Sequence, residues 1–257
     1  MMNITEKIVA RDLRKSFRDA QGRESEALSA LDMTIGAGEF VCLLGPSGCG
    51  KSTLLNLMAG FDTPSGGTLT IDGQPVARPN PRHIAIFQDY GLYPWRTVLG
   101  NILIGLEARG DGKKAARAKA EEVLAMVDLT AFAGHFPSQL SGGMKQRVAL
   151  ARALVVEPDI LFMDEPFAAL DAFTRQRLQE EILRIWLARR PTIVFVTHDI
   201  DEAVFLGTGI AIMSPHPGRI EQILPVDLPR PCDRNDENFL AVRREVYRRF
   251  ARIQVAL

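Results

Sequence analysis

The chain has 257 residues, of which 46% are hydrophobic and 24% charged, close to the average for soluble globular proteins. Lys+Arg and Asp+Glu each number 31, and this balance argues against electrostatic binding of nucleic acid. No apolar run approaches the roughly 20 residues of a membrane span, and the N-terminus lacks a secretory signal. We therefore expect a cytoplasmic protein that reaches a membrane only through a partner.

The hydrophobic pattern predicts an α/β domain. Runs that are apolar throughout are typical of strands buried on both faces, whereas alternating runs are typical of a half-exposed antiparallel sheet. Between residues 89 and 157 the pattern is helical without a buried strand, which predicts an inserted helical subdomain. In chain order the predicted elements are alternating strand 31–35, buried strand 40–44, helix 54–58, alternating strand 68–72, buried strand 84–87, helices 116–127 and 144–155, buried strand 160–163, helix 178–186, buried strands 193–196 and 210–213, and helix 239–250.

A glycine-rich segment between the strand at 40–44 and the helix at 54–58 has the spacing of a phosphate-binding loop. Glycines allow successive backbone N–H groups to face one anion, and the helix N-terminus adds partial positive charge. Lys51 can reach the β- and γ-phosphates, and the Ser52 hydroxyl can ligate Mg²⁺. The predicted contacts are Gly45, Pro46, Ser47, Gly48, Cys49, Gly50, Lys51, Ser52 and Thr53.

The three cysteines have no metal-ligand spacing, and three reduced thiols are expected. Cys49 differs because it lies in the loop, where modification should block nucleotide binding.

Polar side chains follow three of the predicted strands, at the edge where ligands bind in doubly wound sheets. Asp164 is expected to hold Mg²⁺, and Glu165 to polarise the attacking water as a general base. His198 could contact the γ-phosphate and this water, and Gln88 could contact the metal or the water. The alternatives are a polar strand exit, a loop histidine and an inert surface glutamine.

The segment Leu140–Arg147 resembles the signature sequence of ABC ATPases. The phosphate loop, Gln88, this signature, the carboxylates ending at Glu165, the D-loop at 169–171 and the switch His198 follow one another in that family's order. The resemblance covers nearly the whole chain. It implies an α/β P-loop NTPase (RecA-like) core with an antiparallel β subdomain and an inserted α-helical subdomain.

This resemblance implies one ABC ATPase domain across residues 1–257. Residues 1–88 and 158–225 would form the core with the β subdomain. Residues 89–157 would form the helical subdomain, and residues 226–257 a C-terminal helical extension.

The resemblance also implies ATP and Mg²⁺ as cofactors and a head-to-tail dimer, in which each signature caps the ATP held by the other copy. Ser141 is a good N-cap, so the following helix offers a second anion site. The alternative is a capped helix without a ligand. The nucleotide contacts implied outside the phosphate loop are Phe17, Ser141, Gly142, Gly143, Gln146 and Asp171.

The segments 93–98, 213–219 and 226–231 resemble the nitrate, sulfonate and taurine branch of importer ATPases. This implies two integral membrane permease subunits as partners, and through them a substrate-binding protein. The chain would lie on the cytoplasmic face of the bacterial inner membrane. The expected permease contacts are Gln88, Tyr93, Pro94 and Trp95.

Several alternatives stay open at this point. The aromatic side chains at 93–95 could pack within the helical subdomain. The chain could serve another membrane complex or act as a soluble ABC ATPase. Arginines between 243 and 252 could form a solvated helix face or attract anionic lipid.

Overall fold

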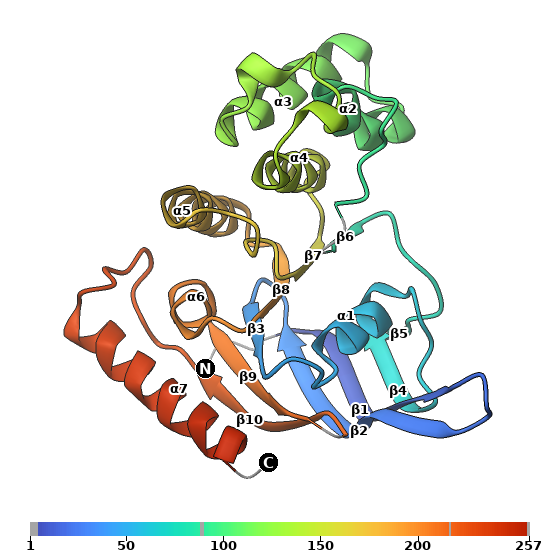
Figure 1. Cartoon of the computed structure of the whole chain (residues 1–257), viewed down its shortest axis with the longest axis vertical. Coiled ribbons are helices and arrows are strands. Elements are labelled where there is room, and N and C mark those ends of the chain that lie inside the picture. Colours follow the sequence, from blue (N-terminus) through green and yellow to red (C-terminus); the bar gives the residue numbers. More distant parts are fainter. Residues whose placement is uncertain (1–4, 88–89, 216, 256–257) are drawn as a thin grey trace.

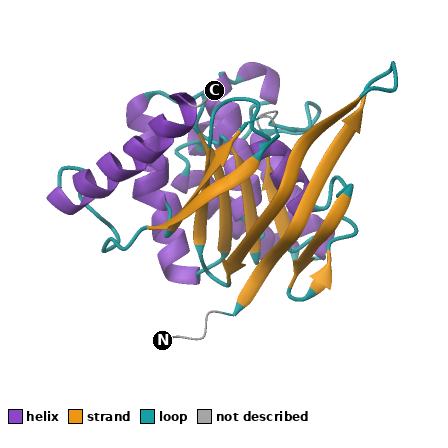
Figure 2. Ribbon diagram, turned by 90° about the horizontal axis from the view of Figure 1, so that it is seen from below, coloured by secondary structure: helices purple, strands orange, loops and turns teal. Residues whose placement is uncertain are grey.

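Two β-sheets organise the chain in the computed structural model, which describes residues 5–87, 90–215 and 217–255 (Figure 1). The larger sheet has the strand order β10-β9-β3-β8-β7-β6 and is parallel except for β10. The smaller sheet, β2-β1-β4-β5, is antiparallel. Seen from below, the strands of both sheets lie in front of most of the helices (Figure 2). The strands are β1 (Glu6–Arg18), β2 (Glu24–Gly36), β3 (Phe40–Leu44), β4 (Gly66–Ile71), β5 (Gln74–Pro75), β6 (His83–Ile86), β7 (Ile160–Asp164), β8 (Thr192–Thr197), β9 (Gly209–Ser214) and β10 (Arg219–Pro225).

The helices divide into two groups along the chain. In Figure 1, α2, α3 and α4 gather at the top, where α4 is the nearest of the three to the larger sheet and contacts β6, whereas α7 lies beside α6, β9 and β10. No helix in the described part of the chain is long and apolar enough to cross a membrane. The α-helices are α1 (Lys51–Ala59), α2 (Val98–Arg109), α3 (Lys113–Met126), α4 (Gly142–Leu154), α5 (Ala172–Arg189), α6 (Ile200–Leu206) and α7 (Glu237–Val255), and two 3₁₀ turns cover Thr130–Phe132 and Pro137–Gln139.

The larger sheet is buried on both faces because its central strands carry apolar side chains at successive positions. On β3, Phe40, Cys42 and Leu44 belong to a hydrophobic cluster that includes residues of α4, α5 and α6. Val41 and Leu43 belong to a second cluster with residues of α1 and of the antiparallel sheet. Helix α1 is thus fixed between the two sheets, and this packing holds the loop that precedes it.

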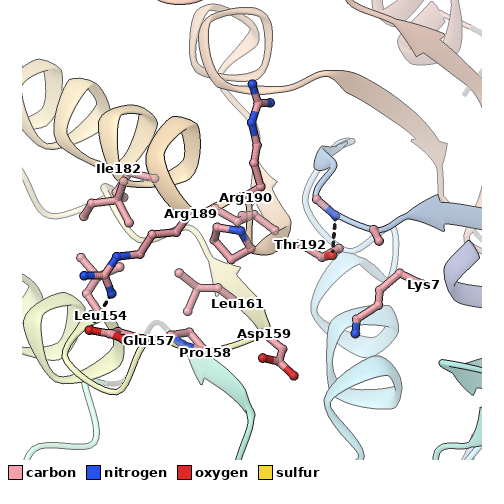
Figure 3. A pocket seen from close by; sticks show the side chains of 15 residues that line it. Lys7, Leu154, Glu157, Pro158, Asp159, Leu161, Ile182, Arg189, Arg190 and Thr192 are labelled. Carbon is pink, nitrogen blue, oxygen red and sulfur yellow. Dashed lines mark hydrogen bonds and ion pairs between the residues drawn. The ribbon is translucent and has the colours of Figure 1, made fainter. Parts of the chain in front are cut away.

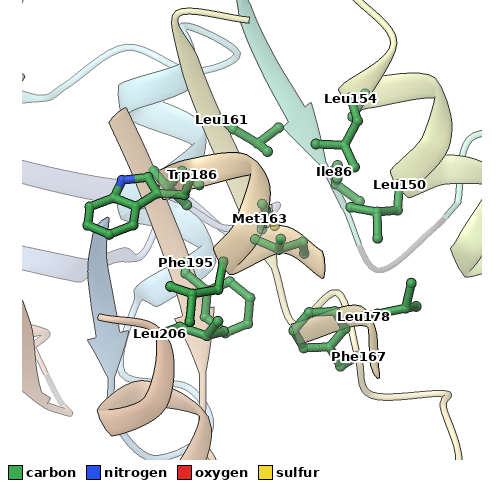
Figure 4. Packing of buried hydrophobic residues seen from close by; sticks show 14 of the residues in the cluster. Ile86, Leu150, Leu154, Leu161, Met163, Phe167, Leu178, Trp186, Phe195 and Leu206 are labelled. Carbon is green, nitrogen blue, oxygen red and sulfur yellow. The ribbon is translucent and has the colours of Figure 1, made fainter. Parts of the chain in front are cut away.

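Aliphatic and aromatic side chains together fill the first cluster between the larger sheet and its helices (Figure 4). Trp186 of α5 is 2% exposed, and its indole N–H donates to the carbonyl oxygen of Gly38 over 3.0 Å. Its ring meets Phe40 edge-on at a centroid distance of 6.1 Å. These contacts fasten α5 to the start of β3, and α5 follows directly on the loop after β7.

All five predicted buried strands are confirmed, each within one residue at either end. The alternating segment 31–35 is confirmed as part of β2, and 68–71 as part of β4, both in the antiparallel sheet. Asp72, the last residue of the predicted strand 68–72, lies in the turn that follows β4. The predicted helices are confirmed too, although Val127 and Val155 are C-caps rather than helical residues.

The described strands lie within residues 6–86 and 160–225, with α2, α3 and α4 between them. The proposed division of the chain into subdomains at 88/89, 157/158 and 225/226 stays a prediction.

Candidate functional site

The phosphate loop connects β3 to α1, as its flanking pattern predicts. Gly48 and Gly50 have φ angles of 80° and 88°, in the left-handed region that side chains disfavour. A Cβ atom on Gly50 would lie 2.6 Å from Cδ2 of Leu28 and 3.0 Å from the carbonyl oxygen of Ala27. Backbone angle and packing therefore both require glycine at position 50, where α1 begins.

Lys51 brings a buried positive charge to this loop. The residue is 6% exposed, and its ammonium donates to the carbonyl oxygens of Gly45 at 2.7 Å and Pro46 at 2.9 Å. These acceptors belong to the loop itself, so Lys51 can exchange them for phosphate oxygens without moving α1. The predicted reach of Lys51 to a β- or γ-phosphate fits this position.

Cys49 is fully buried within the loop, 3.9 Å from the Lys51 ammonium. Burial raises the pKa of its thiol, and the charge of Lys51 opposes that effect only in part. The side chain packs against the backbone of the loop, since a Cβ atom on Gly45 would lie 2.5 Å from its sulfur. A thiol reagent must therefore open the loop to reach this sulfur.

Asp164 ends β7 and is 6% exposed. Burial raises the pKa of its carboxyl group, although a hydrogen bond from Ser52 acts in the opposite direction. Its Oδ1 atom is buried without a hydrogen-bond partner among the described residues. A divalent cation would satisfy this oxygen and compensate its charge, so Asp164 and Ser52 fit the predicted magnesium site.

Glu165 and His198 meet beside this carboxylate. Nδ1 of His198 lies 3.3 Å from Oε1 of Glu165, and the Glu165 side chain is 19% exposed. The Glu165 backbone has a φ angle of 46°, and its N–H donates to the carbonyl oxygen of Val196 at 3.1 Å. The ends of β7 and β8 thus bring the predicted base and switch histidine together. Gln88 lies outside the described residues.

The predicted signature forms the N-terminus of α4. The Ser141 hydroxyl accepts a hydrogen bond from the Met144 N–H at 3.3 Å, which confirms it as the N-cap. Gly143 allows a close approach, because a Cβ atom there would lie 3.3 Å from the carbonyl oxygen of Ala169 and 3.3 Å from Cδ2 of Leu170. Gly142 is exposed. The signature therefore packs directly against the D-loop of its own chain.

Gln146 connects the signature helix to the carboxylate loop. It is 5% exposed; its amide donates to the carbonyl oxygen of Glu165 at 3.3 Å and accepts from the Ala169 N–H at 3.2 Å. Sequence reasoning assigned Gln146 only to nucleotide and missed this bridge, because both partners lie about 20 residues away along the chain. Its predicted nucleotide contact stays a prediction.

Two further predicted contacts lie at the exposed ends of elements. Phe17 is 45% exposed near the end of β1, and the Lys15 ammonium lies 4.8 Å from its ring centroid. Asp171 caps α5 by accepting the Thr174 N–H at 2.9 Å. Both could meet a ligand or a second chain, and both roles stay predictions.

The two predicted anion sites are separate within one chain. Figure 1 shows α4 at the top with the helical group and α1 lower down, where α1 contacts β7 and β8. Each N-terminus is accessible for a different reason: α1 begins at a glycine loop, whereas α4 begins at the exposed residues Ser141 and Gly142. One phosphate group cannot occupy both.

A cavity of about 400 Å³ lies elsewhere, where β7 and β8 begin (Figure 3). Asp159 and Thr192 border it at the starts of these strands, and Arg189 bonds Glu157 across it at 2.7 Å. The phosphate loop and Asp164 follow strand ends instead. Because β3, β7 and β8 are parallel, this cavity belongs to the opposite edge of the sheet and takes no part in the candidate site.

Comparison with known proteins agrees with this geometry. Residues 28–168 match the family model described as ABC transporter. The chain is 48% identical to the taurine import ATP-binding protein of Pseudomonas putida over 80% of this chain and 79% of that one. It is 44% identical to the aliphatic sulfonates import ATP-binding protein of Bacillus subtilis (strain 168), over 91% of each chain.

A solved structure shows the same fold. The ATP-binding cassette MJ0796, in a dimeric post-hydrolysis state bound to ADP and Pi, superposes with a TM-score of 0.78. The match covers 86% of this chain and all of MJ0796, at 33% sequence identity. The predicted α/β cassette fold is confirmed by this likeness. On its sequence, its fold and the arrangement of its phosphate loop and carboxylates, the chain belongs to the ABC transporter family, among the ATP-binding proteins of that family.

Proposed function

We propose that this chain is the ATP-hydrolysing, energy-coupling subunit of an importer for a small sulfonate such as taurine. The observation that carries the proposal is the set of groups gathered at the ends of β3, β7 and β8: a buried lysine in a phosphate loop, a buried carboxylate with one oxygen that has no partner among the described residues, and a carboxylate–histidine pair 3.3 Å apart. The relatives whose names include taurine and aliphatic sulfonates import supply the transport setting.

In this proposal the loop from Gly45 to Thr53 binds the phosphates through its backbone N–H groups, and Lys51 neutralises the β- and γ-phosphates. Ser52 and Asp164 hold Mg²⁺, which supplies charge compensation on the phosphate oxygens when bound. Gln88 is a further candidate ligand of the metal or the attacking water.

Hydrolysis requires a base that can take a proton from the attacking water. Glu165 performs this step, and His198 bonds the water or the γ-phosphate. A position at the ends of adjacent parallel strands keeps both side chains on one side of the phosphate, and the bonds to the Glu165 backbone hold it there.

The second anion site finds its ligand in a second copy of the chain. The Ser141 end of α4 caps the ATP held by the partner's phosphate loop, with Gly142 and Gly143 exposing the first N–H groups. Phe17, Gln146 and Asp171 complete the nucleotide contacts. The dimeric state of MJ0796 supports this arrangement. Binding of ATP then closes the dimer and hydrolysis opens it.

The permease contact proposed here is an exposed aromatic pair after β6. Trp95 is 71% exposed and Tyr93 41% exposed, with ring centroids 5.3 Å apart, so Trp95 does not pack within the helical group. The fully buried Asn101 accepts the Tyr93 N–H at 2.8 Å and donates to three carbonyl oxygens of residues 93–97. Arg152 of α4 donates to the carbonyl oxygen of Gly91 at 2.6 Å.

This loop therefore moves with the helices that carry the signature. Together with Gln88 and Pro94 the pair would transmit dimer closure to two membrane subunits on the cytoplasmic face of the inner membrane. A substrate-binding protein would meet those subunits from the other side.

The permease contact is tested by isolating the tagged chain from detergent-solubilised membranes of its own organism. Mass spectrometry should identify an integral membrane protein with the wild type and much less of it with Trp95→Ala. Phe136→Ala is the matched control, since Phe136 is 42% exposed in the same helical group. Equal recovery with Trp95→Ala and Phe136→Ala would reject this contact, and absence of any membrane subunit would favour a soluble ABC ATPase.

The solute is tested in cells that lack this gene. Growth with taurine or an alkanesulfonate as the only sulfur source should fail, and growth with sulfate should persist. Normal growth on both sulfonates would reject the sulfonate class.

A further inference from the structure

The turn that carries His198 is held by a side chain that the proposed reaction does not use. The Thr197 hydroxyl accepts a hydrogen bond from the Asp199 N–H at 3.0 Å. This bond joins the two residues on either side of His198. The same hydroxyl donates to Oε2 of Glu202 at 2.6 Å. Because a hydroxyl has one proton, this donation turns its lone pairs toward Asp199. Glu202 therefore sets the geometry of the His198 turn.

Glu202 is buried, at 7% exposure, and burial raises the pKa of its carboxyl group. The hydrogen bond from Thr197 acts against this effect, as do the charge of Arg175 and the bond from Gln179. Burying an ionised carboxylate costs free energy unless several hydrogen-bond donors satisfy it. The carboxylate thus depends on its donors, and losing one of them changes how it holds the others.

The second donor connects Glu202 to the C-terminal segment. The Gln179 amide, on α5 and 2% exposed, donates to Oε1 of Glu202 at 3.0 Å. Its own oxygen accepts from the Arg234 guanidinium, which also lies 3.9 Å from the ring centroid of Phe205. Since arginine only donates and a carboxylate only accepts, the Gln179 amide can satisfy both in one orientation. The bonds run from Arg234 through Gln179 to Glu202 and end at Thr197.

Arg175 brings the D-loop to the same carboxylate. Its guanidinium donates to the carbonyl oxygen of Leu170 at 3.1 Å, and its Nε lies 3.9 Å from Oε1 of Glu202. A cavity of about 80 Å³ is lined by Glu165, His198, Arg175 and Glu202. The network therefore borders the proposed hydrolytic groups directly and reaches the C-terminal segment from there.

We propose that Glu202 is a positioning residue for His198, and that Arg234 of the C-terminal segment orients it through Gln179. This rests on the proposed function, in which His198 contacts the γ-phosphate or the attacking water. It gives the segment after β10 a defined part in hydrolysis, because the bonds from Arg234 through Gln179 and Glu202 reach the turn that carries His198.

The test compares steady-state ATP hydrolysis and nucleotide affinity of the full chain for Glu202→Gln, Arg234→Met and the control Arg243→Met. In Glu202→Gln an N–H donor replaces one of the two acceptor oxygens, so either Gln179 loses its acceptor or the Thr197 hydroxyl must accept where it now donates, which turns its proton elsewhere. We expect kcat to fall about tenfold or more for Glu202→Gln and several-fold for Arg234→Met, because small misplacements of reacting groups reduce turnover strongly. The affinity for ATP should stay within about twofold.

Arg243→Met is the matched control because Arg243 lies on the same segment and pairs with Asp201 of α6, outside the network. Its kcat should equal that of the wild type. Equal kcat for all three variants and the wild type would overturn the proposal. A lower kcat for Glu202→Gln with an unchanged kcat for Arg234→Met would also overturn it, because the C-terminal segment would then have no effect on His198.

A double-mutant cycle separates positioning from a loss of stability. If Glu202 acts through His198, adding Glu202→Gln or Arg234→Met to His198→Ala should lower kcat no further. Full additivity would reject the inference. If His198→Ala alone left kcat unchanged, the proposed role of His198 would fail instead, and the two failures are thereby distinguished.

Discussion

Replacing Glu165 with glutamine should abolish most hydrolysis without altering the fold. The substitution keeps the size of the side chain, and the two backbone bonds that fix the residue, to Val196 and Gln146, are unaffected. The amide can occupy the same position 3.3 Å from Nδ1 of His198 but cannot take a proton from water. A positioned general base contributes about 10²–10⁴-fold. We therefore expect kcat to fall by that factor, which corresponds to about 3–5 kcal/mol of transition-state stabilisation.

The assay measures phosphate release at saturating ATP together with the affinity for nucleotide. Affinity should be retained, since Lys51 and the phosphate loop are unchanged, and ATP should drive this variant into a long-lived dimer. Glu181→Gln is a matched control, because Glu181 is 24% exposed and pairs only with Arg184 on α5 among the described residues. A kcat of Glu165→Gln within about threefold of the Glu181→Gln value would refute the assignment of the base.

Three further predictions concern stability and access. Trp186→Phe should lower the free energy of unfolding in urea by about 3 kcal/mol, because it removes the bond to Gly38 and shrinks a buried ring; a loss below about 1 kcal/mol would contradict the packing described. The pKa of Glu157 lies below its ordinary value of 4.5, chiefly through the hydrogen bond from Lys119, so this ion pair stabilises the fold above that value and stops doing so as the pH falls through the lowered pKa. The difference in unfolding free energy between wild type and Glu157→Gln should thus be present at neutral pH and vanish in acid, and a difference that persisted in acid would count against the pair. A thiol reagent should label Cys232 before the buried Cys49, and ATP affinity should be lost only when Cys49 reacts; early labelling of Cys49 would show that the loop opens readily.

The central strands were predictable because burial on both faces leaves a continuous apolar run, as in β3, β7 and β8. The strand β1 was not predicted. It carries seven charged residues among its thirteen, and register shifts between Ala10 and Ser16 break its alternation. Helix α6 was missed because its seven residues span only two turns.

The candidate site likewise has features that were predictable from the sequence and features that were not. The phosphate loop, the carboxylates after β7 and the Ser141 cap were predictable because their chemistry depends on local spacing and on adjacent elements. The bridge from Gln146 to Glu165 and the bond from Thr197 to Glu202 depend on how helices pack on the sheet. A single glutamine or glutamate on a helix carries no local signal for such a bond, so neither bond could be predicted from the sequence.

The claim that two chains share each site is tested most directly by mixing two inactive variants. Ser141→Arg blocks the signature but keeps the phosphate loop. Lys51→Ala disables the phosphate loop but keeps the signature. Among randomly formed dimers half contain both variants, and each of these has one intact site, so the mixture should recover about one quarter of wild-type turnover. Lys51→Ala mixed with Glu165→Gln should recover none, because both defects then lie in the same half of the site. Recovery in the first mixture alone is the predicted result; a first mixture as inactive as its components, or Ser141→Arg active by itself, would contradict the shared site.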